Sequence, residues 1–86
     1  MKYKIEFTSS FKRDLQKVEK SRLKLIFSAL ENLSNFPHIQ NLKKLKVYNN
    51  LYRVRVGSYR ILFHNEVPSV LTVFAIKKRK DVYKNL

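Results

Sequence analysis

A pair of alternating segments around the dipeptide Gly57-Ser58 constrains the fold of this 86-residue chain more than any other feature. Residues 52–56 alternate apolar with cationic side chains, and residues 59–64 keep the same two-residue period beyond the dipeptide. Alternation of this kind is typical of strands with one buried face. The single glycine of the chain stands where a tight hairpin turn requires a positive φ. The sequence therefore predicts a β-hairpin over these residues.

The residues before the hairpin predict one strand and two helices. Charged and apolar residues alternate over 2–7, which predicts a first strand. Apolar residues at helical spacing then predict a short helix capped by Ser9 or Ser10 and a longer amphipathic helix capped by Ser21. The longer helix must end before Pro37, because a proline disfavours helical backbone in the residue that precedes it. We expect the two helices to form a hairpin.

The remaining segments complete a small α+β domain. Residues 37–50 are polar with isolated leucines and are interpreted as a loop, whereas 70–76 are apolar enough for a strand covered on both faces. The predicted order is β-α-α-β-β-β, a small and mainly antiparallel sheet with the helical hairpin packed on one face. The length allows a single domain over residues 1–86, which must be held together by packing because cysteine is absent.

Positive charge is the first functional signal. The formal net charge is +13; residues 1–42 hold eight Lys or Arg and four Asp or Glu, whereas residues 43–86 hold eleven and two. Such a field favours a polyanionic partner, either nucleic acid or an acidic protein, and a basic solvated surface is the alternative. The apolar stretch 70–76 is too short to span a bilayer and the first residues do not resemble a signal peptide. We therefore expect a cytoplasmic protein without a membrane partner.

Few residue types are available for chemistry. His38 and His64 lie 26 positions apart, cysteine is absent and no acidic cluster occurs, so we expect no metal and no cofactor. One glycine is too few for a phosphate-binding loop. Catalysis would therefore depend on Arg, Lys, Tyr and, at most, His.

The predicted hairpin gathers arginines on one face of its sheet. Arg53 and Arg55 share a face of their strand, and the turn returns Arg60 beside them. His64 has the same parity as Arg60 and could reach this face. Guanidinium groups stay charged at neutral pH and bind phosphate oxygens in a bidentate manner, so this face suits a phosphodiester. Solvated arginines on an uncovered sheet face are the alternative that the spacing leaves open.

The hairpin and the segments on either side of it resemble a known toxin family. Residues 52–63, 41–45 and 79–83 (RKDVY) are similar to toxins of the RelE/ParE superfamily, in particular its RelE-like mRNA interferase branch. The resemblance implies a RelE-like, microbial RNase-like fold and a ribosome-dependent endoribonuclease that cuts messenger RNA in the ribosomal A site without a metal. It also implies a cognate antitoxin, which the charge predicts to be acidic, and contact with operator DNA only through the antitoxin complex.

The same resemblance implies a catalytic site of five residues. By position these are Arg53, Arg55, Arg60, Arg79 and Tyr83. Tyr83 is the candidate general base for the 2′-hydroxyl, because neighbouring guanidiniums would favour its anion. Arg60 and Arg79 would hold the scissile phosphate, while Arg53 and Arg55 would orient the flanking backbone or stabilise the departing 5′-oxygen.

Two features depart from the family pattern. The pair at 53 and 55 is lysine in well-known members and arginine here, and Lys78 stands where relatives often carry histidine. Because arginine is a poor proton donor, His64 is a further candidate acid or base, whereas His38 is expected to have no chemical role. Six lysines are interpreted as contacts to the RNA backbone, namely Lys43, Lys44, Lys46, Lys77, Lys78 and Lys80.

Two other functions stay open from the sequence. A toxin of the same fold could inhibit DNA gyrase by binding, with no chemistry of its own. A non-catalytic basic module that binds nucleic acid is the third candidate, although the helices lack the pattern of a recognition helix.

Overall fold

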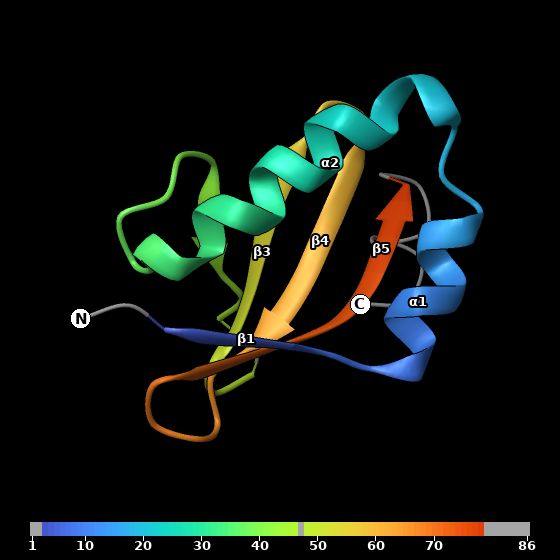
Figure 1. Cartoon of the computed structure of the whole chain (residues 1–86). Helices are drawn as coiled ribbons and strands as arrows, with labels where there is room; N and C mark the ends of the chain where they lie inside the picture. The colour runs from blue at the N-terminus through green and yellow to red at the C-terminus, as the bar shows by residue number, and fades with distance from the viewer. Residues whose placement is uncertain (1–2, 47, 79–86) are drawn as a thin grey trace.

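The computed structural model describes residues 3–46 and 48–78, which form a five-stranded mixed sheet with two helices (Figure 1). In chain order the elements are β1 (Lys4–Phe7), α1 (Ser9–Gln16), α2 (Lys20–Asn32), the 3₁₀ turn η1 (Leu33–Asn35), β2 (Leu42–Lys44), β3 (Leu51–Val56), β4 (Tyr59–His64) and β5 (Val70–Lys78). The strand order is β1-β5-β4-β3-β2; β1 is parallel to β5 and the other neighbours are antiparallel. The predicted α+β class is confirmed.

The short strand β2 was not predicted, because its segment was interpreted as part of a loop. Leu42 lies opposite Val54 of β3, and its side chain packs against the buried core. The isolated leucine that was interpreted as an anchor is therefore the inward residue of a strand. With three residues, β2 is too short to show a readable alternation in sequence.

The central hairpin agrees with its prediction. Val56 lies opposite Tyr59, and Gly57 adopts a φ of 60° at the first of the two turn positions. A positive φ at that position is what a type II′ turn requires, and glycine adopts it without strain. The turn therefore fixes the register that places Arg55 opposite Arg60.

Helix α2 covers one face of the sheet. Figure 1 shows it crossing β3 and β4, and its Ile26 is fully buried together with Leu33 of η1. These side chains join one core cluster with Ile61 and Phe63 of β4. Tyrosines, valines and phenylalanine of the hairpin therefore face α2, and the alternate residues of β3 and β4 face the other way.

Helix α1 lies against β5 near the end of the sheet (Figure 1). The hydroxyl of Ser10 donates to the carbonyl oxygen of Phe74 at 2.8 Å, and the amide of Ile76 donates to Oδ2 of Asp14 at 3.1 Å. The β1–β5 pairing ends at Val73, so α1 supplies partners to β5 beyond the last residue of β1. This use of α1 places one carboxylate beside the end of β5.

The helix caps differ from those expected from the sequence. Thr8, with extended backbone, caps α1 by accepting a hydrogen bond from the amide of Phe11 at 3.1 Å, whereas Ser9 and Ser10 are already helical. Glu19 precedes α2 and makes no side-chain cap, and Ser21 lies inside the helix. The expected cap of α1 was wrong because Thr8, Ser9 and Ser10 are consecutive residues that can all cap a helix, and the expected cap of α2 was wrong because that helix begins one residue before Ser21.

Strand β5 is longer than predicted and irregular. It continues to Lys78, and its register with β4 shifts so that Ala75 lies opposite Leu62 while Val73 lies opposite Phe63. Phe74 is thus the extra residue of a β-bulge. Within the described residues, neither helix has the length and hydrophobicity needed to cross a bilayer.

Candidate nucleic-acid interface

Three cations form a row across the centre of the sheet, on the face turned away from α2. Arg55 of β3 lies opposite Arg60 of β4, and Arg60 lies opposite Lys77 of β5. We call these three residues the cation row. Like charges on directly opposed strand positions destabilise a sheet by roughly 0.2–1 kcal/mol per pair. A row of this kind gathers positive charge at one place on the sheet and can attract an anion.

Arg60 stands at the centre of the row and is only 3% exposed. Its Nη1 donates to the carbonyl oxygen of Tyr59 at 3.2 Å and to that of Gly57 at 3.5 Å, so the guanidinium is tied to the hairpin backbone. The sequence left open whether Arg60 is a solvated arginine of an uncovered sheet face, and its burial excludes that alternative. Arg60 lies on β4, the central strand of the sheet, with β3 and β5 on either side. The guanidinium keeps its charge despite burial and has little freedom to move.

Lys77, at one end of the row, is an ion-pair partner of α1. Its Nζ lies 3.5 Å from Oδ2 of Asp14, the same oxygen that accepts from the amide of Ile76. The carboxylate offsets part of the lysine charge and holds the side chain against β5. Lys77 was predicted to contact RNA, and the structure gives it this local partner as well.

The other predicted lysines divide between the two faces of the sheet. Lys43 lies opposite Arg53 and so shares the face of the cation row. Lys44 lies opposite Tyr52, and Lys78 lies opposite Tyr59, so the register places both on the α2 side. Lys46 is exposed in the loop after β2. Of these four lysines, the structure therefore brings Lys43 alone to the face that carries the arginines.

Three predicted site residues, Arg79, Lys80 and Tyr83, lie outside the described part of the chain. Their roles stay predictions. Arg53, Arg55 and Arg60 are brought together on one face as predicted; Arg53 is half-buried and Arg55 is exposed.

The two histidines lie in different environments. His64 lies on the face of the cation row, where its ring stacks on that of Phe74 with centroids 5.7 Å apart and planes inclined by 28°. Its Nδ1 is buried and has no hydrogen-bond partner among the described residues. His38 is exposed and lines a groove on the opposite side of β3.

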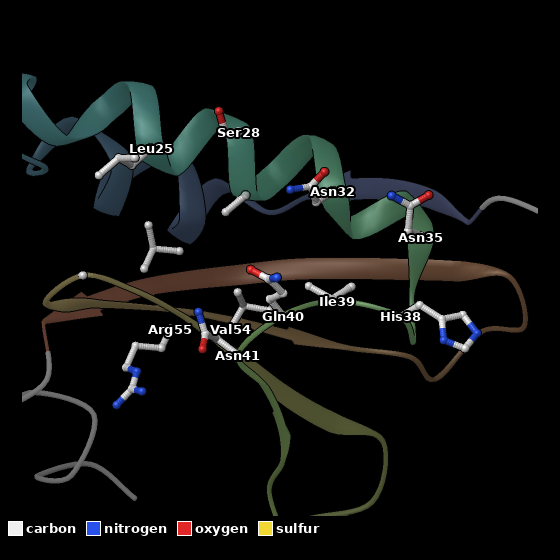
Figure 2. A pocket seen from close by; sticks show the side chains of 13 residues that line it. Leu25, Ser28, Asn32, Asn35, His38, Ile39, Gln40, Asn41, Val54 and Arg55 are labelled. Carbon is white, nitrogen blue, oxygen red and sulfur yellow. The ribbon is translucent and has the colours of Figure 1, made fainter.

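That groove, of about 500 Å³, separates α2 from the edge of β3. Figure 2 shows Asn32 of α2 and Gln40 of the following loop pointing into the space between the two elements, while Arg55 points away from α2. The backbone carbonyl oxygen of Asn41, a residue with a φ of 64°, accepts a hydrogen bond from the backbone amide of Arg55 at 3.3 Å, and both residues line the groove. Sequence reasoning missed this feature, because it depends on the loop folding back against β3. Its lining mixes amide and aliphatic side chains, and Arg55 is its only arginine or lysine among the described residues, so the candidate interface lies on the face that carries the cation row.

Within residues 3–46 and 48–78, no group of three or more His, Asp or Glu side chains could hold a metal ion.

Similar proteins agree in sequence and in fold. Residues 5–83 match the family described as the ParE toxin of the type II toxin-antitoxin system parDE. Toxin RelE3 of Methanocaldococcus jannaschii is 35% identical over 85 residues, which cover 93% of this chain and 94% of that protein. A chain of the crystal structure of the RelB-RelE antitoxin-toxin complex from Methanococcus jannaschii has a TM-score of 0.79 at 28% identity, covering 94% of this chain and 98% of that chain. A mutant of Escherichia coli toxin RelE in the free state shares the fold, with a TM-score of 0.75 at 21% identity over 98% of this chain and 93% of that one.

Proposed function

The chain belongs to the RelE/ParE superfamily of type II toxins and is RelE-like, and from this premise we propose that it is a metal-independent endoribonuclease that cuts messenger RNA in the ribosomal A site. The observation that carries the proposal is the cation row, with the guanidinium of Arg60 buried at its centre. Fixed cations aimed at a phosphate stabilise the charge that develops on it, and they act without reorganisation during the reaction.

The proposed reaction is an attack by the RNA on itself. The 2′-oxygen forms a bond to phosphorus and the bond to the 5′-oxygen breaks; the departing 5′-oxygen takes a proton from water, which leaves a 2′,3′-cyclic phosphate and a 5′-hydroxyl. Tyr83 takes the proton of the 2′-hydroxyl, and Arg60 and Arg79 neutralise the non-bridging oxygens. Arg53 and Arg55 lie beside Arg60 on the same face, where they can hold the flanking phosphates or stabilise the departing oxygen.

An antitoxin is the proposed protein partner. One of the similar structures is a RelB-RelE antitoxin-toxin complex, and the net charge of +13 on this chain favours an acidic partner. We propose that the cognate antitoxin inhibits the toxin and that contact with operator DNA occurs only through their complex.

Binding inhibition of DNA gyrase is a second candidate, because the matching family is described by the ParE toxin. A toxin that only binds gyrase has no need for a guanidinium buried in a row of like charges. The cation row therefore favours the nuclease.

One experiment separates the two candidates. The purified toxin is added to ribosomes paused with a defined A-site codon, and in parallel to gyrase in a DNA supercoiling assay. We expect cleavage within the A-site codon and products with 2′,3′-cyclic phosphate ends. Intact RNA from a folded toxin, together with loss of supercoiling, would establish the gyrase inhibitor instead.

A further inference from the structure

A small aromatic pocket lies on the face of the cation row, at the opposite end of β3 and β4. It has a volume of about 290 Å³. Leu51 and His64, which lie opposite one another, have the same parity as Arg53 and Arg60 and so form its floor on that face. The residues that line it, here called the aromatic pocket, are Tyr48, Asn49, Leu51, His64, Glu66 and Phe74.

The walls of the aromatic pocket present flat rings. Phe74, the extra residue of the β5 bulge, stacks on His64, and both rings are only partly buried. Tyr48 is 45% exposed and is held by its amide, which donates to the carbonyl oxygen of Leu45 at 3.3 Å. A pocket at the lower end of the roughly 300–1,000 Å³ typical of sites for drug-sized ligands, with aromatic walls, suits a single planar ring. Stacking on such side chains is a general way to bind an unpaired base.

The acidic residue of the pocket, Glu66, lies in a strongly basic half of the chain. Glu66 is one of two acidic residues among residues 43–86. The turn that carries it is fixed by Asn65, whose amide donates to the carbonyl oxygen of Asn50 at 2.9 Å. With the side-chain amide of Asn65 oriented so that its nitrogen faces the carbonyl oxygens of Val67 and Val70, this nitrogen donates to them at 2.9 Å and 3.0 Å. A carboxylate repels phosphate and accepts hydrogen bonds from amino groups, so the pocket suits a base and not the backbone.

We propose that the aromatic pocket binds one unpaired base of the RNA substrate and that Glu66 selects bases with an exocyclic amino group over uracil. The inference rests on the proposed nuclease function, because it places the pocket along the RNA path. His64 lies four positions after Arg60 along β4, which corresponds to about 13 Å along the strand. That distance matches a short stretch of single-stranded RNA, so the base bound here is a near neighbour of the scissile phosphate.

Binding of nucleotides to the isolated full-length toxin tests the pocket without cleavage. CMP, AMP, GMP and UMP are titrated into isotope-labelled protein, and the NMR signals of His64 and Phe74 are followed. We expect the three amino-bearing nucleotides to shift these signals and to bind about tenfold more tightly than UMP. Glu66→Gln should reduce the preference severalfold, while Tyr48→Ala should weaken all four nucleotides by about fivefold or more. Glu31→Gln, at an exposed acid on α2, is the matched control and should change neither result.

Each other outcome counts against a distinct claim. NMR shifts confined to the residues of the cation row, or an affinity for UMP equal to that for the other nucleotides, would refute the proposal that the pocket binds and selects a base. Shifts of the pocket signals by an acidic antitoxin peptide and by none of the nucleotides would also overturn it, and would make the pocket a protein-binding site. Base-selective binding by a toxin that cuts no RNA on the ribosome would refute the proposed function and leave the pocket standing.

Discussion

Replacing the buried arginine of the cation row gives the sharpest test of the proposed chemistry. Arg60→Met keeps a long, flexible side chain and removes the charge that would stabilise the phosphate in the transition state. Loss of one such donor lowers the rate by about 10²-fold to 10³-fold, or about 2.7–4 kcal/mol. We therefore expect single-turnover cleavage of A-site messenger RNA, at saturating toxin, to fall by that factor while ribosome binding changes little.

The free energy of unfolding of the same variant should change by less than the free energy of activation for cleavage. The substitution removes the hydrogen bond to the carbonyl oxygen of Tyr59, and bonds from charged donors contribute about 1.5–3 kcal/mol. It also relieves repulsion with Arg55 and Lys77, worth up to about 1 kcal/mol for each pair. The two effects oppose one another, so the free energy of unfolding should fall by no more than about 2.6 kcal/mol, measured by urea denaturation.

Circular dichroism under the assay conditions decides between loss of chemistry and loss of fold. A hundredfold loss of activity through unfolding would require about 99% of the molecules to be unfolded, which the spectrum would reveal. Arg22→Met, at an exposed arginine of α2, is the matched control and should keep full activity. Arg60→Lys, which retains the charge but not the planar fork, should recover part of the rate. A folded Arg60→Met toxin that cleaves at close to the normal rate would refute the catalytic role of the cation row.

Three further predictions address neighbouring residues. Lys43→Gln should weaken binding of single-stranded RNA and lower the magnitude of the slope of log affinity against log salt by about 0.7. Lys44→Gln should leave the affinity and the slope unchanged, because the register places Lys43 and Lys44 on opposite faces of the sheet. Fluorescence anisotropy titrations at several salt concentrations measure the affinity and the slope. Asp14→Asn should strengthen RNA binding at low salt, since it removes the carboxylate that offsets Lys77, and an unchanged affinity would mean that Lys77 lies off the RNA path. Tyr83→Phe should lower the single-turnover cleavage rate by about 10²-fold to 10⁴-fold. The rate of the wild-type toxin should rise with pH as Tyr83 ionises. Equal rates for the wild type and the variant would exclude Tyr83 as the general base.

The elements that could be predicted from sequence are those whose signal is local. The β3–β4 hairpin is specified by its alternation and by Gly57 at the turn, and the structure reproduces both. The caps were wrong, because Thr8 and the serines that follow it satisfy the same local pattern and the choice depends on the approach of β5. Strand β2 was missed since Leu42 is recognisable as a strand residue only when β3 lies beside it.

The candidate site shows the same division. That Arg53, Arg55 and Arg60 share a face follows from strand parity alone. The burial of Arg60 does not follow from strand parity. Its surroundings depend on β5, which is distant in sequence and brings Lys77 to the other side of Arg60. The aromatic pocket depends on a bulge that changes the register at Phe74, and a shift of one residue leaves no mark in the hydrophobic pattern of an apolar strand.

The distribution of charge along the cation row bears on how an RNA strand would cross the sheet. At the β5 end, Asp14 lies 3.5 Å from the ammonium of Lys77 and offsets part of its charge. At the β3 end, Arg55 is exposed, and Arg53 and Lys43 lie opposite one another across β3 and β2. A phosphate backbone is attracted most strongly where positive charge is least offset. Under the proposed function, the phosphates that flank the scissile one therefore lie over β3 and β2. The RNA strand then reaches Arg60 from the β3 side of the sheet, away from α1.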